Sequence, residues 1–313
     1  MFEIRRYTEA DKLVWDDFVA QSKNGTFLFF RSYMDYHADR FRDHSLMIFL
    51  EDCLYALLPA NEADGVFYSH QGLTYGGLVM SQRCKAAHVR DIFAQLNDYL
   101  RQHGLCRVVY KHLPWVYAKL PAEEDLFALS NVCHASLKSR DVASVVMLDC
   151  RLPFSELRKR CVKKAEKAGV TIQEAQDCGA FWSLLENNLK EKYGAHPVHS
   201  LEEITLLKSR FPQHIRLFVA YKDDTLLGGT LLYVTAQTVK TQYISANEEG
   251  RRVGALDLLF SQLLDKSSEN NMKYFDFGTS NLVENDDLND SLIFQKEGFG
   301  ARAVCYDTYE YDL

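Results

Sequence analysis

The chain has 313 residues, of which 47% are hydrophobic and 25% charged, so it is an ordinary globular protein rather than a disordered or fibrous one. Its formal net charge of -7 argues against a generally basic nucleic-acid-binding protein. No run of 18 apolar residues is present, and the N-terminus lacks the apolar core of a signal peptide, so we expect a cytoplasmic protein without a membrane span. The scattered cysteines contain no CxxC pair, which favours reduced thiols.

The first half of the chain predicts several strands and one amphipathic helix. Residues 45–60 predict a hairpin, and residues 65–80 continue with strand character. A helix is predicted over 86–103 because its apolar residues recur at three- and four-residue spacing. Residues 106–113 then predict a buried strand.

The second half repeats this order of elements. It predicts a hairpin over 215–235, a strand over 238–246, a helix over 253–268 and a strand over 273–278. One interpretation is two copies of a single mixed α/β unit; the other is a chance similarity of the kind that any chain of strands and helices can show.

The motif RLPFSELRKR opens a new helix after the strand VASVVMLDC, so we place the domain boundary before that helix, with one domain over 1–148 and the other over 149–313. The last segment, 301–313, alternates as a strand does, and a short helix over 291–299 precedes it.

The succession hairpin, strand, Gly turn, helix, strand resembles the GNAT acyltransferase fold. Its doubling resembles the Fem-type family, which adds amino acids to peptidoglycan precursors, and the acetyltransferase relatives of that family. Three segments carry the resemblance, namely LRKRCVKKAEKAGVTI (157–172), KYFDFGTSN (273–281) and LIFQKEGFG (292–300), with weaker support from 24–41. The resemblance implies an α/β protein with mixed sheets and two tandem GNAT-like acyl-CoA N-acyltransferase domains, in which the last strand returns to the first domain.

The turn from Gly250 to Ala255 is the predicted donor site. The first N–H groups of a helix lack internal partners and can hold a pyrophosphate, and two arginines stand beside them. The alternative is a solvated turn, and the motif also departs from the GNAT pattern by placing Leu256 at the final small position. The predicted donor-binding residues are Ser245, Ala246, Asn247, Arg251, Arg252, Val253, Gly254 and Ala255.

The resemblance also implies that strands 238–246 and 273–278 separate and expose backbone groups to the donor. Asp276 stands between two phenylalanines, where it acts as a general base or has only a structural role. Tyr243 shares one side of its strand with Ser245 by period two. Asp276 and Tyr243 are the predicted catalytic residues.

Candidate acceptor-binding residues are scattered along the chain. They come from a polar-aromatic cluster near residue 31, the Gly-rich loop 69–77, the basic helix 155–168 and the family-like C-terminal motif, and each also has a structural interpretation. The predicted substrate-binding residues are Arg31, Tyr36, His70, Tyr75, Lys163 and Lys296. His196-Pro-Val-His199 is a poor metal motif because proline breaks a helix, so we predict no metal.

No nucleophile signature such as Gly-x-Ser-x-Gly is present, which favours direct attack by an amine on a bound acyl donor. The leading hypothesis is transfer of an acyl group, acetyl in the first instance, from acyl-CoA to an amine of an anionic cell-envelope precursor. Two alternatives stay open. One is a Fem-type transferase that uses aminoacyl-tRNA, and the other is a non-catalytic binding protein of the same fold.

Overall fold

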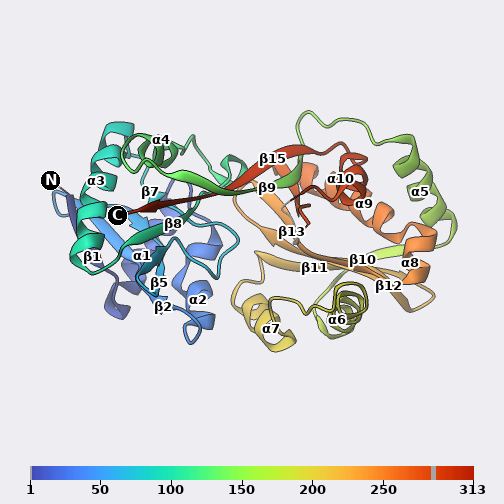
Figure 1. Ribbon diagram of the computed structural model, residues 1–313. Coiled ribbons are helices and arrows are strands. Elements are labelled where there is room, and N and C mark those ends of the chain that lie inside the picture. The colour runs from blue at the N-terminus through green and yellow to red at the C-terminus, as the bar shows by residue number, and fades with distance from the viewer. Residues whose placement is uncertain (1, 283–286) are drawn as a thin grey trace. The chain divides into compact units, whose positions relative to one another are not determined.

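The computed structural model describes residues 2–282 and 287–313 and divides into two compact units (Figure 1). Unit 1 is formed by the residues up to Asp141 together with Cys305–Leu313, and unit 2 by Val142–Val304. The chain enters unit 2 within β9 (Ser136–Met147), ahead of the predicted boundary at 148/149. Both units combine mixed β-sheet with helices. Within the described residues, no helix is long and apolar enough to cross a bilayer.

Unit 1 contains two groups of strands. The first has the order β1 (Phe2–Arg6), β3 (Leu46–Leu50), β4 (Cys53–Leu58), β7 (Val79–Met80). The second has the order β15 (Arg302–Asp312), β8 (Arg107–Lys111), β6 (Val66–Tyr68), β5 (Asn61–Ala63), β2 (Arg42–Asp43). The helices are α1 (Lys12–Gln21), α2 (Arg31–Met34), α3 (Ala86–Gln102) and α4 (Glu124–Asn131). The predicted hairpin and helix are confirmed by β3–β4 and α3.

The predicted strand region 65–80 is mostly a loop. Only β6 and β7 are strands there, because the glycines in between let the backbone fold tightly onto itself. A Cβ on Gly76 would lie 1.6 Å from the carbonyl oxygen of Ser69, so no other residue fits this loop without moving the chain.

Unit 2 is a sheet with the order β10 (Thr171–Ala175), β11 (Ile215–Lys222), β12 (Thr225–Val234), β13 (Thr238–Ala246), β14 (Tyr274–Thr279), β9. Its helices are α5 (Glu156–Lys167), α6 (Gly179–Tyr193), α7 (Leu201–Arg210), α8 (Glu248–Val253), α9 (Ala255–Glu269) and α10 (Asp290–Glu297). Figure 1 shows α9 and α10 above the sheet and α6 and α7 below it. The predicted hairpin, strands and C-terminal helix of this half are confirmed.

An aromatic cluster forms the centre of unit 2 beneath α9. The rings of Phe260 and Phe277 have centroids 5.0 Å apart, and Phe277 stacks on Phe299 at 5.5 Å. Each of these side chains is buried, so the cluster joins α9, β14 and the chain after α10 through the hydrophobic effect.

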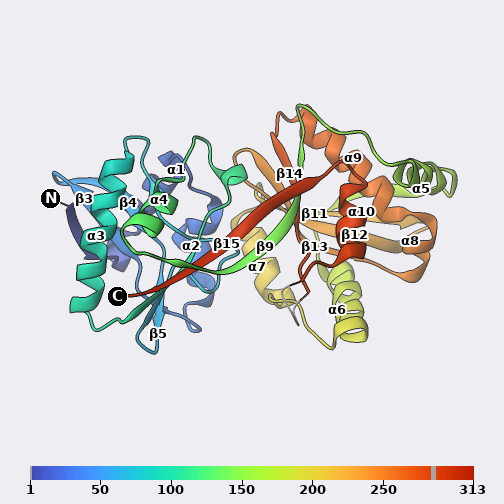
Figure 2. The same cartoon turned by 45° about the horizontal axis from the view of Figure 1, so that its top comes forward.

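The predicted helix over 253–268 is two helices joined at a glycine. Gly254 has φ +83°, ends α8 and starts α9. A Cβ there would lie 2.8 Å from the carbonyl oxygen of Cys161 on α5. Gly254 therefore permits both the left-handed conformation and the close packing of α5 on the α8–α9 junction (Figure 2).

We expect Gly254→Ala to destabilise the protein by about 2–4 kcal/mol, because a left-handed alanine costs about 1–2 kcal/mol and crowding of the Cys161 carbonyl adds to that. Gly169→Ala is the matched control: Gly169 follows α5 with φ +75° and has nothing within 4 Å of its Cβ position. Urea unfolding of both variants measures the difference. Equal losses of stability would contradict a role for Gly254 in helix packing.

Candidate active site

The site begins where β13 and β14 separate. These parallel strands pair at three positions only, Thr238 with Tyr274, Val239 with Phe275 and Lys240 with Asp276. On its other side, β13 pairs with β12 through a bulge at Gln242, since Tyr243 and Thr241 face consecutive residues of β12. A bulge bends and twists its strand, so it turns β13 away from β14. The separation implied by the family resemblance is present.

A cavity of about 470 Å³ occupies the gap between the two strands. Its wall comes from β13 and β14, from α6 on one side of the sheet, and from α8 to α10 on the other. The lining residues are Leu185, Asn188, Leu189, Lys192, Lys240, Thr241, Gln242, Ile244, Ser245, Ala246, Arg251, Leu256, Phe260, Phe277, Gly278, Thr279, Leu292, Gln295, Lys296 and Phe299.

Among the described residues of this wall, the charged side chains are all basic, namely Lys192, Lys240, Arg251 and Lys296. Lys296 is 5% exposed, and its ammonium donates to the carbonyl oxygens of Gly278 and Thr279, both at 2.9 Å, and to the Ser280 hydroxyl at 2.7 Å. Burial, with a smaller contribution from Lys240, lowers the pKa of Lys296 to about 8, against the opposing effect of Asp276. The cavity thus favours an anionic ligand.

Asp276 lies beneath the cavity wall rather than on it. Its side chain is fully buried, and Oδ1 accepts a 2.6 Å hydrogen bond from the backbone N–H of Gly278, which has φ +73°. The carboxylate therefore holds the turn at the end of β14, as the structural interpretation expects. This hydrogen bond does not test the predicted catalytic role of Asp276, which stays a prediction.

Tyr243 does not line the cavity. Its hydroxyl lies 2.6 Å from Nδ1 of His199, and its ring meets Trp182 edge-on with centroids 5.0 Å apart. Burial raises the pKa of Tyr243 to about 12. The structure therefore does not bring the two predicted catalytic residues together on one surface.

The predicted donor-binding residues divide into two groups. Ser245, Ala246 and Arg251 line the cavity, and so does Leu256, the residue that departs from the family pattern. Asn247 instead caps α8, accepting a 2.7 Å hydrogen bond from the Gly250 N–H.

The other predicted donor-binding residues face elsewhere. Arg252 pairs with Glu249 on the exposed side of α8. Val253, Gly254 and Ala255 are in the helix junction and do not line the cavity.

The first turn of α9 already contains a carboxylate. Asp257 accepts a 2.5 Å hydrogen bond from the guanidinium of Arg158 on α5, and burial raises the pKa of Asp257 while Arg158 opposes that shift. This ion pair offsets part of the positive helix dipole, which reduces the attraction of the predicted pyrophosphate niche for a further anion.

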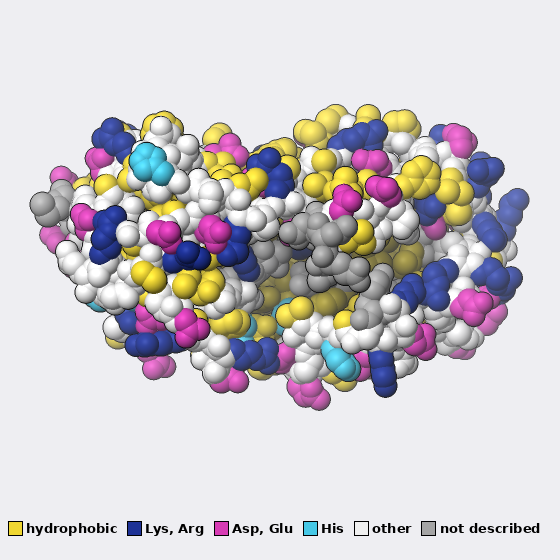
Figure 3. Space-filling view, viewed as in Figure 1, with side chains coloured by type: hydrophobic (Ala, Val, Ile, Leu, Met, Phe, Trp, Pro, Cys, Tyr) yellow, Lys and Arg dark blue, Asp and Glu magenta, His cyan; other side chains and the backbone are white. Residues whose placement is uncertain are grey.

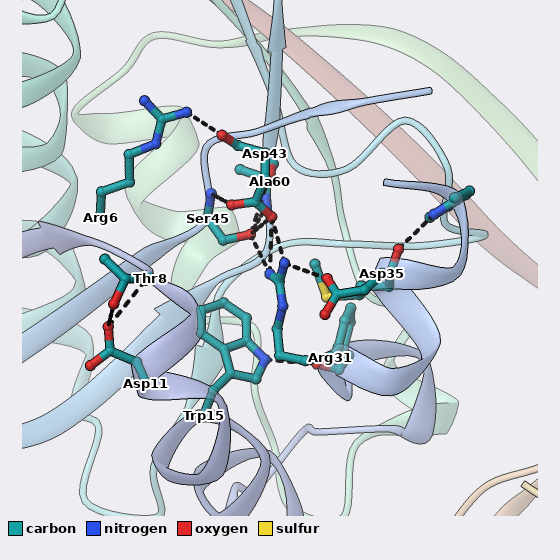
Figure 4. Close-up of polar contacts among 12 residues, drawn as sticks. Arg6, Thr8, Asp11, Trp15, Arg31, Asp35, Asp43, Ser45 and Ala60 are labelled. Carbon is teal, nitrogen blue, oxygen red and sulfur yellow. Dashed lines mark hydrogen bonds and ion pairs between the residues drawn. The ribbon is translucent and has the colours of Figure 1, made fainter. Parts of the chain in front are cut away.

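The predicted acceptor residues of unit 1 are mostly in structural contacts. Arg31 is buried and bonds Asp35 at 2.6 Å, Asp43 at 2.9 Å and Ser45 at 3.2 Å (Figure 4). Its guanidinium also lies 4.0 Å from the ring centroid of Tyr7. With this many partners, the head group of Arg31 stabilises the fold rather than facing a ligand.

The aromatic members of that cluster pack together. Tyr36 stacks on His37 with centroids 4.2 Å apart, and His37 stacks on His70 at 5.6 Å. Burial lowers the pKa of His70 to about 3, so His70 is neutral at physiological pH. The Tyr75 hydroxyl donates to Thr26 at 3.3 Å.

In unit 2, Lys163 is exposed on α5. Lys and Arg side chains gather at the right edge of Figure 3, where Figure 1 shows α5. Lys240 and the α6 residues of the cavity wall were missed from the sequence. A lysine within an alternating strand suggests a solvent-facing residue, and α6 reaches the cavity only through tertiary packing.

Among the described residues, no cluster of three or more His, Cys, Asp or Glu is placed to hold a metal ion.

We expect Asp276→Ala to destabilise the protein by about 1.5–3 kcal/mol, because it removes a charge-assisted acceptor and leaves the buried N–H of Gly278 unsatisfied. Asp276→Asn keeps an oxygen acceptor and is the matched control, with a smaller loss. Denaturant unfolding of the two variants tests this. A full loss of stability in Asp276→Asn would mean that the negative charge, not the hydrogen bond, matters.

The pKa of Lys296 is directly measurable. We expect the side-chain resonance of Lys296 in ¹³C-lysine-labelled protein to titrate near pH 8, with Lys296→Arg used for assignment. Because this pKa lies below the value of about 10.5 for an unfolded lysine, the unfolded chain binds more protons between these pH values. The contribution of Lys296 to folding stability therefore rises with pH in that window.

Lys240→Met removes the neighbouring positive charge and should raise the pKa of Lys296. A wild-type midpoint above 10, or one unchanged by Lys240→Met, would contradict this electrostatic description of the cavity.

Comparison with known proteins agrees with this geometry. Residues 156–286 match the family model for the acetyltransferase (GNAT) domain, whereas no curated protein sequence matches the chain. The structure of FemX superposes with a TM-score of 0.72 at 10% identity, covering 99% of this chain and 97% of FemX.

Two further solved structures share the fold. The C-terminal domain of a putative lysylphosphatidylglycerol synthetase from Agrobacterium fabrum gives a TM-score of 0.62 at 12% identity, with 97% and 92% of the two chains covered. A tandem GNAT protein from the clavulanic acid biosynthesis pathway gives 0.53 at 11% identity, with 100% and 98% covered. Residues 156–286 therefore match the acetyltransferase (GNAT) domain, and the chain shares the fold of FemX and of a tandem GNAT protein.

Proposed function

We propose that this protein is a cytoplasmic N-acyltransferase that moves an acyl group from acyl-CoA to an amine of an anionic precursor, of the kind used in the cell envelope. The observation that carries the proposal is the cavity between β13 and β14, within the segment that matches the GNAT domain. Separated strands offer backbone groups that no neighbouring strand occupies, and such groups suit an extended, amide-bearing donor arm.

The dimensions of the cavity suit that donor. From Lys240 to Ala246 the wall follows β13 over six residue steps, or about 20 Å at a rise of about 3.3 Å per residue. This length accommodates an extended pantetheine arm, with Arg251 near the end where α8 begins. The donor phosphates then lie toward α8 and the acyl group toward Lys240.

In the proposed reaction the acceptor nitrogen attacks the thioester carbonyl. The new C–N bond forms, the C–S bond breaks, CoA leaves as a thiolate, and the ammonium proton of the intermediate passes to water or a side chain. Lys296, fixed by three oxygen acceptors beside the cavity, supplies positive charge near the developing oxyanion. The positioned amine supplies the nucleophile, so no covalent acyl-enzyme is needed.

A second candidate donor is aminoacyl-tRNA, as in Fem-type transferases. It is favoured by Leu256 on the cavity wall and by the Asp257–Arg158 pair, which together make the α9 terminus a poorer pyrophosphate site. The exposed basic side chains of α5, including Arg160, Lys163 and Lys167, offer a surface for a nucleic-acid backbone.

The donor proposal is tested by thermal unfolding with acetyl-CoA. A ligand at 100 times its Kd stabilises the folded state by about 2.7 kcal/mol, so we expect a rise of a few degrees in the Tm of the wild type. Gln242→Trp places an indole in the cavity and should abolish this rise. Gln173→Trp, on the exposed edge strand β10, is the control and should retain it.

Stabilisation by charged tRNA but by no acyl-CoA would favour the second donor. Binding of a precursor without turnover by any donor would identify a non-catalytic protein. Equal stabilisation of both tryptophan variants by acetyl-CoA would place the donor outside this cavity.

A further inference from the structure

The side chain of Lys240 is largely buried in the cavity wall, and its ammonium reaches the cavity. Lys240 is 8% exposed and lies at the last paired position of β13, where the two strands begin to separate. A Cβ on Gly278 would lie 3.2 Å from its Nζ, which places the ammonium beside the turn after β14. In the part of the chain that the structure describes, this ammonium has neither a hydrogen bond nor an ion pair.

The surroundings of Lys240 carry excess positive charge. Lys296 is close enough for Lys240 to lower its pKa, and all three of its donors are bound to protein oxygens. The nearby carboxylate, Asp276, accepts a hydrogen bond from the Gly278 backbone. Among the described residues, two cations therefore lie beside one anion where β13 and β14 begin to separate.

A partly desolvated ammonium that faces a cavity attracts a compensating anion. We propose that Lys240 binds a carboxylate carried by the substrate at its reacting end, and that the acyl group is consequently a dicarboxylic half-thioester of the malonyl or succinyl class. This inference rests on the proposed function and specifies its substrate.

The location of Lys240 favours the acyl group as the source of this carboxylate. With the donor phosphates toward Arg251 and the acyl group toward Lys240, a second carboxyl group on the acyl chain would reach the Lys240 ammonium. A neutral acetyl thioester would leave the ammonium unpaired in the substrate complex. An amino-acid acceptor could supply the same chemical group, its α-carboxylate, in place of the acyl group.

The test is calorimetric titration of the full chain with acetyl-CoA and succinyl-CoA. We expect the wild type to bind succinyl-CoA at least tenfold more tightly, since hydrogen bonds to charged groups correspond to about a tenfold to hundredfold change in Kd. Lys240→Met should abolish the preference and leave acetyl-CoA affinity within about threefold. Lys240→Arg retains the charge and should preserve the preference.

Lys190→Met removes one positive charge from the exposed side of α6, outside the cavity, and should behave as the wild type. Circular dichroism melts of each variant establish that it is folded. In a second arm, the protein saturated with acetyl-CoA is titrated with L-alanine and with ethylamine. Suppose that alanine binds more tightly than ethylamine, that this difference depends on Lys240, and that succinyl-CoA is not preferred. This result would assign the bound carboxylate to the acceptor and would still support a carboxylate site at Lys240.

Equal affinities in both arms for the wild type and Lys240→Met, with acetyl-CoA still bound, would overturn this inference and leave the proposed function standing. A loss of turnover in Lys240→Met that is the same for every donor, with affinity ratios unchanged, would also overturn it and assign Lys240 to the oxyanion. Failure of every CoA species to bind the wild type would overturn the proposed function itself.

Discussion

The separation of β13 from β14 after three paired positions is the constraint on which the site depends. Features of both strands produce this separation. The bulge at Gln242 bends β13 toward β12, and the turn at Gly278, held by the carboxylate of Asp276, redirects the chain after β14. The stacked rings of Phe277 and Phe299 form part of the wall of this gap. Hydrophobic packing thus borders a gap in the hydrogen-bonded sheet.

The charge of the described cavity wall is opposite in sign to the net charge of the whole chain. The protein has a net charge of -7, yet the charged residues of the cavity wall, as far as the structure describes it, are all basic. Such a local field attracts an anionic substrate regardless of the overall charge, because screening and the protein interior limit the reach of distant carboxylates. The acidic composition therefore excludes a generally basic surface but says little about the ligand.

Much of the fold follows from the sequence, because periodicity reports which face of an element is buried. The hairpin β11–β12, the helix α3 and the terminal strand β15 were predictable in this way. The residues of the site were less predictable from the sequence. Period two places Tyr243 and Ser245 on one side of β13, but only Ser245 lines the cavity, because the Tyr243 side chain packs on Trp182 and bonds His199. The partners of Arg31 and the contribution of α6 arise from contacts distant in sequence, which no local pattern encodes.

The carbonyl oxygen of Ala246 in the cavity wall is already hydrogen-bonded within the protein. It accepts hydrogen bonds from the Asn188 amide at 3.0 Å and from the Arg251 guanidinium at 2.5 Å, so its acceptor capacity is used by the protein. An amide-bearing chain laid along β13 finds no vacant acceptor for its N–H at that carbonyl. The same contacts tie α6 and α8 to one atom of the strand, so a shift of either helix would be transmitted to the entrance of the cavity.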